Sequence, residues 1–105
     1  MSTNIDAKYV KLDKDIKKME MQAEPTLKCK VADLSLSGLA LTIFGSHNLQ
    51  VADELMVAFT LDDKGNTHIK RKAIIRVIGQ GFVGCQFNEA DSPAYDKALG
   101  FYLMP

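Results

Sequence analysis

Residues 27–44 read LKCKVADLSLSGLALTIF, and the fold is decided in this stretch. From Leu27 to Val31, apolar residues alternate with lysines, so one side of the segment is apolar and the other is charged. This period of two is typical of a β-strand that has one face on a core and one face in water. After Gly38 the run LALTIF is apolar on both faces, which predicts a second strand after a short polar connection.

The same period continues outward on both sides of this stretch. On the N-terminal side, methionines alternate with polar residues over 18–22, and Ala23-Glu24-Pro25-Thr26 is a turn signal that predicts a first hairpin. On the C-terminal side, the turn signals are Asp62-Asp63-Lys64-Gly65-Asn66 and Gly79-Gln80-Gly81. The expected strands cover residues 18–22, 27–31, 39–44, 55–61, 67–78 and 82–87. About six short strands joined by tight turns indicate a small antiparallel barrel or sandwich.

The alternation also predicts which residues face the interior of this sheet. We expect the inward-facing set to include Leu27, Cys29, Val31, Leu41, Val57, Phe59, Ile75, Val77, Val83 and Phe87.

The two ends of the chain differ from the middle. Residues 1–15 are charged with little periodicity, so we interpret them as an N-terminal arm. Near the C-terminus the period changes to that of a helix over residues 93–104, with Pro93 at its first position. The apolar stripe that would dock this helix on the barrel includes Tyr95, Leu99 and Tyr102. Residues 16–105 are therefore expected to form one all-β domain closed by a C-terminal α-helix.

Composition limits the possible partners. The chain has 105 residues, of which 47% are hydrophobic, and this suffices for one packed core. Lys and Arg total 13 and Asp and Glu total 13, so no overall field attracts polymeric nucleic acid or an anionic membrane. An anionic ligand has to be held by local charge. No apolar run resembles a signal peptide or is long enough to span a bilayer, which favours a cytoplasmic protein without membrane insertion.

The sequence contains none of the common catalytic arrangements. No nucleophile and base, carboxylate pair or metal-ligand cluster occurs at a useful spacing, so we expect neither an enzyme, nor a metal site, nor a cofactor. Cys29 and Cys85 lie in apolar surroundings without CxxC spacing, and we interpret them as buried free thiols.

The polar connection DLSLSG, residues 33–38, is the sharpest local feature. Asp33 and Ser35 place short polar side chains where one strand ends, and Gly38 permits a close approach that a Cβ would block. Such a corner suits recognition of a planar base, because a carboxylate accepts two N–H donors of a guanine. It equally suits a turn in which the side chains satisfy their own backbone.

The order of charged arm, hairpin, DxSxxG, further strands with GFVGCQF, and terminal helix resembles the PilZ domain, the bacterial receptor for the second messenger cyclic di-GMP. The resemblance covers about Lys8 to Leu103. It implies that a DxSxxG motif contacts a guanine, and Asp33, Ser35 and Gly38 match that motif. It also implies an RxxxR motif on the preceding arm that binds the phosphates and stacks on the bases.

This second motif is degenerate. By spacing it falls on residues 7–11, where Ala7 and Lys11 replace the two arginines and Lys8 is a neighbouring charge. A lysine offers phosphate a point charge but neither a planar fork nor a stacking face. Tyr9 suits either a stacking platform or an anchor of the arm.

The arginines of the chain, Arg71 and Arg76, lie on the long predicted strand instead. We expect Arg71 and Lys72 on an exposed strand face, where a position at the barrel rim would make them phosphate contacts.

The resemblance implies a single-domain cyclic di-GMP receptor that acts through an effector protein. Its expected ligand-binding residues are Lys8, Lys11, Asp33, Ser35, Gly38 and Arg71. The alternative is a protein-interaction adaptor that keeps the PilZ fold and has lost nucleotide binding, and the missing arginines favour it.

Overall fold

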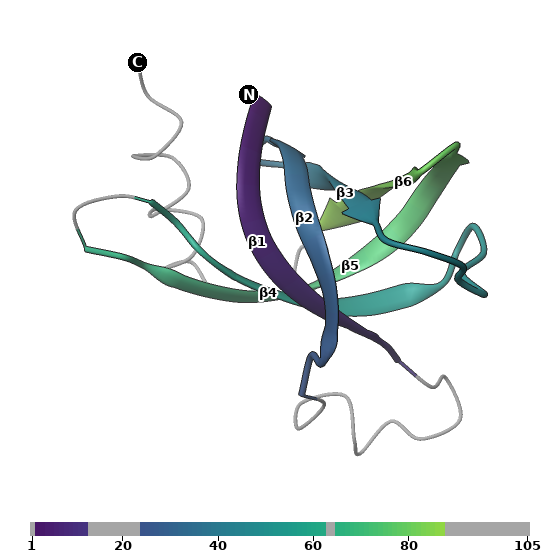
Figure 1. The fold of residues 1–105 in the computed structure, drawn as a ribbon, viewed down its shortest axis with the longest axis horizontal. Helices are drawn as coiled ribbons and strands as arrows, with labels where there is room; N and C mark the ends of the chain where they lie inside the picture. Colours follow the sequence, from purple (N-terminus) through teal and green to yellow (C-terminus); the bar gives the residue numbers. More distant parts are fainter. Residues whose placement is uncertain (1, 13–23, 63–64, 88–105) are drawn as a thin grey trace.

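The computed structural model describes residues 2–12, 24–62 and 65–87, which form a closed antiparallel barrel (Figure 1). Its strands are β1 (Ser2–Lys11), β2 (Leu27–Leu34), β3 (Gly38–Ile43), β4 (Glu54–Thr60), β5 (His68–Gly79) and β6 (Phe82–Phe87). They pair in the order β1-β2-β3-β6-β5-β4, and β4 pairs with β1 to close the ring. The expected six-stranded antiparallel barrel is thus confirmed. The expected C-terminal helix lies outside the described residues, which include no helix long and apolar enough to cross a membrane.

The N-terminal segment corrects the sequence analysis, because residues 2–11 are a strand of the barrel and not an arm. β1 lies between β2 and β4 and pairs with both. Ile5, Ala7 and Tyr9 are buried, whereas Asp6 and Lys8 between them are exposed. This alternation has the period of two that identifies a strand. In the sequence it is hard to recognise, because the alternating segment is short and charged residues flank it. The partner of β2 in the first hairpin is β1, and the strand expected over residues 18–22 lies outside the described part of the chain.

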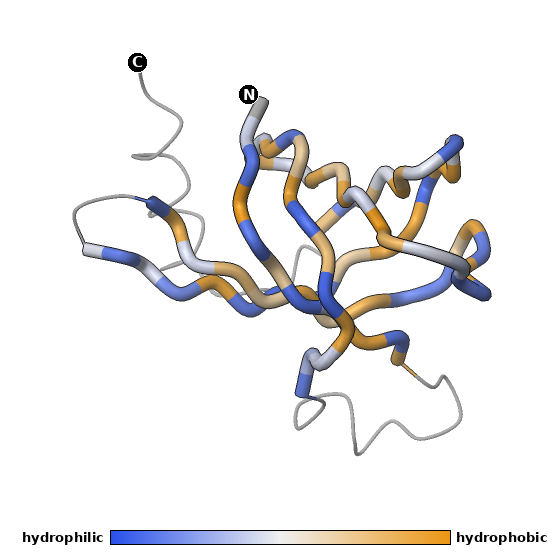
Figure 2. The backbone as a smooth tube through the Cα atoms, in the orientation of Figure 1, coloured by the Kyte–Doolittle hydropathy of each residue, from blue (hydrophilic) through white to orange (hydrophobic). Residues whose placement is uncertain are grey.

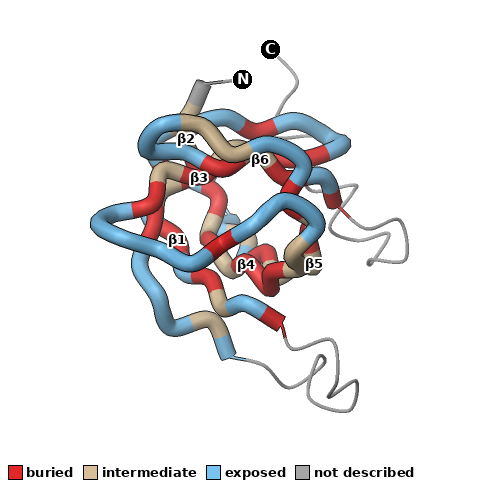
Figure 3. Tube along the Cα trace, turned by 90° about the vertical axis from the view of Figure 1, so that its right-hand side faces the viewer, coloured by how far each residue is buried: buried red, intermediate tan, exposed pale blue. Residues whose placement is uncertain are grey.

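The core follows the predicted alternation at most positions. Apolar and polar residues alternate along the strands, and the apolar ones face inward (Figures 2 and 3). The predicted inward residues that are buried are Cys29, Val31, Leu41, Val57, Phe59, Ile75, Val83 and Phe87. Two predictions are wrong, since Leu27 is 52% exposed and Val77 is 50% exposed. Leu27 is the first residue of β2, where the strand extends beyond the core.

A β-bulge explains why Val77 faces outward. Ile75 pairs with Cys85, but Val77 pairs with Gly84, so β5 uses two residues where β6 uses one. The extra residue is Arg76. A bulge shifts the alternation by one position, and as a result Arg76 and Val77 are both exposed.

A second bulge occurs in β2. Val31 pairs with Leu41 and Asp33 pairs with Ala40, which leaves Ala32 as the extra residue. Asp33 is exposed as a result, although an uninterrupted alternation from Val31 would turn it inward.

The interior also contains both cysteines as free thiols, as the sequence predicted. Burial raises the pKa of Cys29 and of Cys85 to about 12. Both thiols therefore stay protonated at neutral pH and act as small apolar side chains.

Phe59 tests the core assignment. It is 5% exposed and belongs to the main apolar cluster. For Phe59→Ala we expect a loss of about 3 to 5 kcal/mol of unfolding free energy, because the truncation leaves a cavity. Chemical denaturation measures this loss, with Leu27→Ala as the exposed control. A change below about 1 kcal/mol for Phe59→Ala would contradict the assignment.

Gly38 tests the closeness of β3 and β6. A Cβ added to Gly38 would collide with the carbonyl oxygen of Cys85 on the neighbouring strand. We expect Gly38→Ala to lower the unfolding free energy by about 1 to 3 kcal/mol, as overpacking does. Gly45→Ala is a poor control because its φ is +76°, so we would use Gly65→Ala, where the nearest atom is an ordinary 3.7 Å away. Equal thermal midpoints for Gly38→Ala and the parent would rule out this close approach.

Candidate functional site

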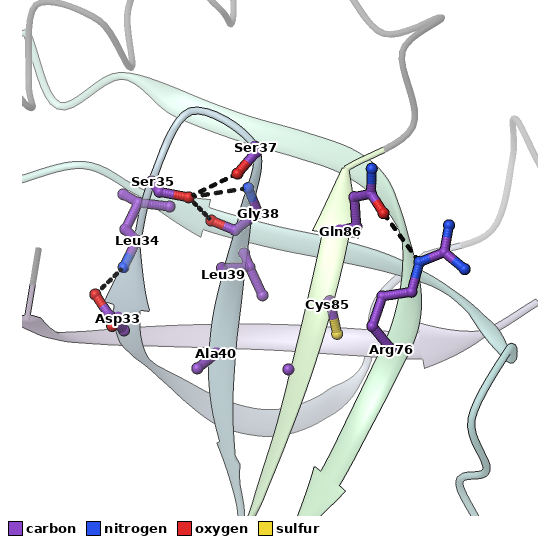
Figure 4. A pocket seen from close by; sticks show the side chains of 11 residues that line it. Asp33, Leu34, Ser35, Ser37, Gly38, Leu39, Ala40, Arg76, Cys85 and Gln86 are labelled. Carbon is purple, nitrogen blue, oxygen red and sulfur yellow. Dashed lines mark hydrogen bonds between the residues drawn. The ribbon is translucent and has the colours of Figure 1, made fainter.

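The DxSxxG corner lies at one edge of a pocket of about 490 Å³ on the barrel surface (Figure 4). The pocket extends from the end of β2 across β3 and β6 to β5. Its lining residues are Asp33, Leu34, Ser35, Ser37, Gly38, Leu39, Ala40, Arg76, Gly84, Cys85 and Gln86. The volume is within the usual range for small-molecule sites.

Small residues form the floor of this pocket. Ala40 of β3 pairs with Asp33 on one side and with Gly84 on the other. Gly84 in turn pairs with Val77 of β5. This row crosses four strands, and at about 4.8 Å between strands it spans roughly 14 Å. Ala40 and Gly84 are the middle residues of this row, and the Val77 side chain lies over Gly84, with its Cγ1 2.6 Å from the position that a Cβ would take. The open part of the floor is therefore at Ala40.

Ser35 organises the turn between β2 and β3. Its N–H donates to the carbonyl oxygen of Gly38 at 2.9 Å, and its hydroxyl accepts the N–H of Gly38 at 3.2 Å. The same hydroxyl lies 3.2 Å from the Ser37 hydroxyl and 3.3 Å from the Gly38 carbonyl oxygen. Ser35 therefore makes the turn hydrogen bonds that the sequence suggested, and they hold the corner in one shape.

Asp33 stands at the edge of the pocket beside this turn. Its Oδ1 accepts the backbone N–H of Leu34 at 2.9 Å, which fixes the carboxylate next to the strand end. The side chain is exposed because the β2 bulge turns it outward. The carboxylate is thus oriented by the backbone and accessible from the pocket.

Arg76 and Gln86 form the opposite edge, as Figure 4 shows. The Nε–H of Arg76 donates to Oε1 of Gln86 at 2.9 Å. Both side chains are exposed, and Arg76 is the extra residue of the β5 bulge. The pocket therefore has a carboxylate on one side and a guanidinium on the other.

The lysines expected to bind phosphate lie far from this pocket. Asp33 pairs with Ser2, whereas Lys8 and Lys11 lie six and nine residues farther along β1. At about 3.3 Å per residue, they are roughly 20 and 30 Å away along the strand. Lys8 is exposed, and Nζ of Lys11 lies 3.4 Å from a carboxylate oxygen of Asp53. The structure does not bring them to the corner.

The neighbours of these lysines face the barrel interior. Ala7 is 7% exposed and Tyr9 is 5% exposed, so neither position presents a side chain to a surface ligand. Burial, and secondarily the nearby Cys29, raise the pKa of Tyr9. Of the two roles considered for Tyr9, anchoring is the one that fits. An arginine at position 7 would enter the core.

Arg71 is also not on an exposed face, which corrects the sequence analysis. It is 3% exposed, and its guanidinium carbon lies 4.1 Å from the centroid of the Phe87 ring. This is a cation–π geometry in the barrel interior. Lys72 is partly exposed, with Nζ 3.4 Å from a carboxylate oxygen of Glu54. Neither residue lines the pocket at the corner.

Three pocket residues that the sequence did not predict as site residues are Arg76, Gln86 and Gly84. The Gly79-Gln80-Gly81 turn indicated a hairpin that brings Arg76 and Gln86 near each other, and this was the available signal. Strict alternation from Ile75 turns Arg76 outward, but it does not predict the bulge that turns Val77 outward as well.

Comparison with known proteins agrees with this fold. A family model described as the PilZ domain matches residues 7–104. The crystal structure of the PilZ domain of CeSA from a cellulose-synthesizing bacterium is similar, with a TM-score of 0.65 and 14% sequence identity. The match covers 94% of this chain and 88% of that chain. A comparison with curated proteins finds no match. Since the family model spans nearly the whole sequence, the chain belongs to the PilZ domain family.

Proposed function

We propose that this PilZ domain is a receptor for cyclic di-GMP, which binds in the pocket beside the DxSxxG corner and alters contacts with an effector protein. The family supports the ligand, because PilZ domains are known to bind cyclic di-GMP. The observation that carries the proposal is the row of Asp33, Ala40 and Gly84 on adjacent strands. It combines an oriented carboxylate with a flat floor.

A guanine fits the chemistry of this row. Its Watson–Crick edge presents two N–H donors, and an ionised carboxylate accepts both in parallel. The purine ring requires a surface without large side chains that project toward it, and Ala40 next to Asp33 provides one, bounded by the Val77 side chain over Gly84. Because Ser35 and Gly38 hold the turn through their own hydrogen bonds, little ordering of the corner is needed on binding.

Lys8 and Lys11 are not included in this site, because they lie toward the other end of β1. Arg71 is not included either, because it is buried against Phe87. Signalling would require that the ligand binds one conformation of the domain more tightly than another. Ligand binding would then change the surface to which an effector protein binds.

A second candidate function is a protein-interaction adaptor without a nucleotide ligand. The observation that favours it is the absence of arginine from residues 7–11, together with the burial of Ala7 in the core. In this case the hydrogen bonds of Ser35 and Asp33 serve only to shape the turn.

Asp33→Ala separates the two functions. If the carboxylate binds guanine, the substitution weakens cyclic di-GMP binding by about 1 to 3 kcal/mol, since one partner of a charged hydrogen-bond pair is lost. Isothermal titration calorimetry measures the affinity, and thermal unfolding of the free protein measures stability. The matched control is Asp6→Ala, which removes an exposed aspartate on β1 whose carboxylate lies 3.7 Å from Nζ of Lys30.

The receptor proposal requires parent binding, weaker binding for Asp33→Ala and parent-like binding for Asp6→Ala. Absence of binding by the parent supports the adaptor. An Asp33→Ala variant that loses stability but keeps the parent affinity would also support the adaptor.

Ser35→Ala tests the internal role of the corner. The substitution removes the hydroxyl that accepts the Gly38 N–H, so we expect a loss of about 1 kcal/mol of unfolding free energy. Ser46→Ala, in the loop after β3, is the exposed control. If both variants unfold at the denaturant concentration of the parent, the turn does not depend on the Ser35 hydroxyl.

A further inference from the structure

Arg76 lies at an irregularity of the backbone beside the pocket. It is the extra residue of the β5 bulge, and its exposed side chain lies on the same outer surface as Gln86. Bulges often redirect one side chain next to a binding site. A regular strand after the inward-facing Ile75 would place one outward residue here, whereas the bulge places two, Arg76 and Val77.

The hydrogen bond to Gln86 leaves the useful part of the guanidinium available. Oε1 of Gln86 accepts a hydrogen bond from Nε of Arg76 at 2.9 Å, and this is the one side-chain hydrogen bond that Arg76 makes to the described residues. The two terminal nitrogens, Nη1 and Nη2, then form a planar fork with parallel N–H donors. Such a fork matches two oxygens of a phosphate, which lysine cannot do.

The position of Arg76 complements that of Asp33. The two residues line opposite edges of one pocket and are separated by the small residues of β3 and β6 (Figure 4). A cyclic dinucleotide carries bases and phosphates at different points of one rigid ring. With a base at Asp33, a phosphate can reach the guanidinium across the floor.

We propose that Arg76 binds a phosphate of the ligand and that Gln86 is its positioning residue. Arg76 thereby supplies from β5 the guanidinium that residues 7–11 lack. This inference rests on the proposed cyclic di-GMP function and adds the residue that contacts the phosphodiester.

The test is calorimetric titration of cyclic di-GMP into the full chain and its variants. Arg76→Ala is expected to raise Kd about tenfold to a hundredfold, as loss of a hydrogen-bonded charge does. Arg76→Lys keeps the charge without the fork and is expected to fall between Arg76→Ala and the parent. Because Arg76 is exposed, the thermal midpoint of the free protein is expected to stay within about 2 °C of the parent value.

Lys28→Ala is the matched control for net charge. Lys28 is an exposed residue of β2 away from the pocket, and its removal also costs one positive charge. If Arg76 acts only through the general field of the protein, both variants weaken binding equally. A local contact predicts that Lys28→Ala stays within about twofold of the parent, because exposed charges are screened over such distances.

Gln86 is tested through its dependence on Arg76. Gln86→Ala alone is expected to raise Kd about threefold, a typical effect of a lost neutral hydrogen bond. In the Arg76→Ala background the same change is expected to have no further effect, since Gln86 acts through the guanidinium. Additive effects in this double-mutant cycle would show that Gln86 does not position Arg76.

Failure of this inference differs from failure of the proposed function. If the parent does not bind cyclic di-GMP, the proposed function fails and the role of Arg76 fails with it. If the parent binds and Asp33→Ala weakens binding, but Arg76→Ala equals Lys28→Ala, only the role of Arg76 is overturned.

Discussion

Closure of the sheet is the constraint on which the rest of the structure depends. Each strand pairs with two neighbours, although β1 pairs with β4 only from Ala7 onward and β5 pairs with β6 only from Ala73 onward. Closure requires β1 to fit between β2 and β4 and to alternate in register with both. That requirement makes a strand of a segment whose charge suggests an arm, and it buries Ile5, Ala7 and Tyr9.

The pocket of the candidate site lies where the alternation of this closed sheet is interrupted. A regular barrel places every outward residue by period two, and bulges are the means of departing from this rule. The β2 bulge turns Asp33 outward, and the β5 bulge lies at Arg76, which follows the inward-facing Ile75 and is already outward by alternation. Between them, close contact of β3 with β6 excludes side chains larger than hydrogen at Gly38. Each edge of the pocket therefore lies at or next to a bulge, with the closely spaced β3 and β6 between them.

The corner itself is held by internal hydrogen bonds. The Ser35 hydroxyl and the Gly38 backbone bond to each other, and the Ser37 carbonyl oxygen accepts the N–H of Phe87 on β6. A turn secured in this way on both strands keeps its shape without a ligand. The polar residues of the motif thus combine a structural task with the presentation of the Asp33 carboxylate, and the two interpretations of the motif from sequence are compatible.

The sequence by itself determined the strand pattern, the antiparallel barrel, most of the core and the polar corner, because period-two burial and turn chemistry are local properties. Only the tertiary structure decided that the charged Arg71 lies inside against Phe87, that Val77 is exposed, and that Lys8 and Lys11 are remote from Asp33. The physical reason is that these facts depend on strand register. A bulge adds one residue without any change in composition, and the partners of β1 are set by segments distant in sequence.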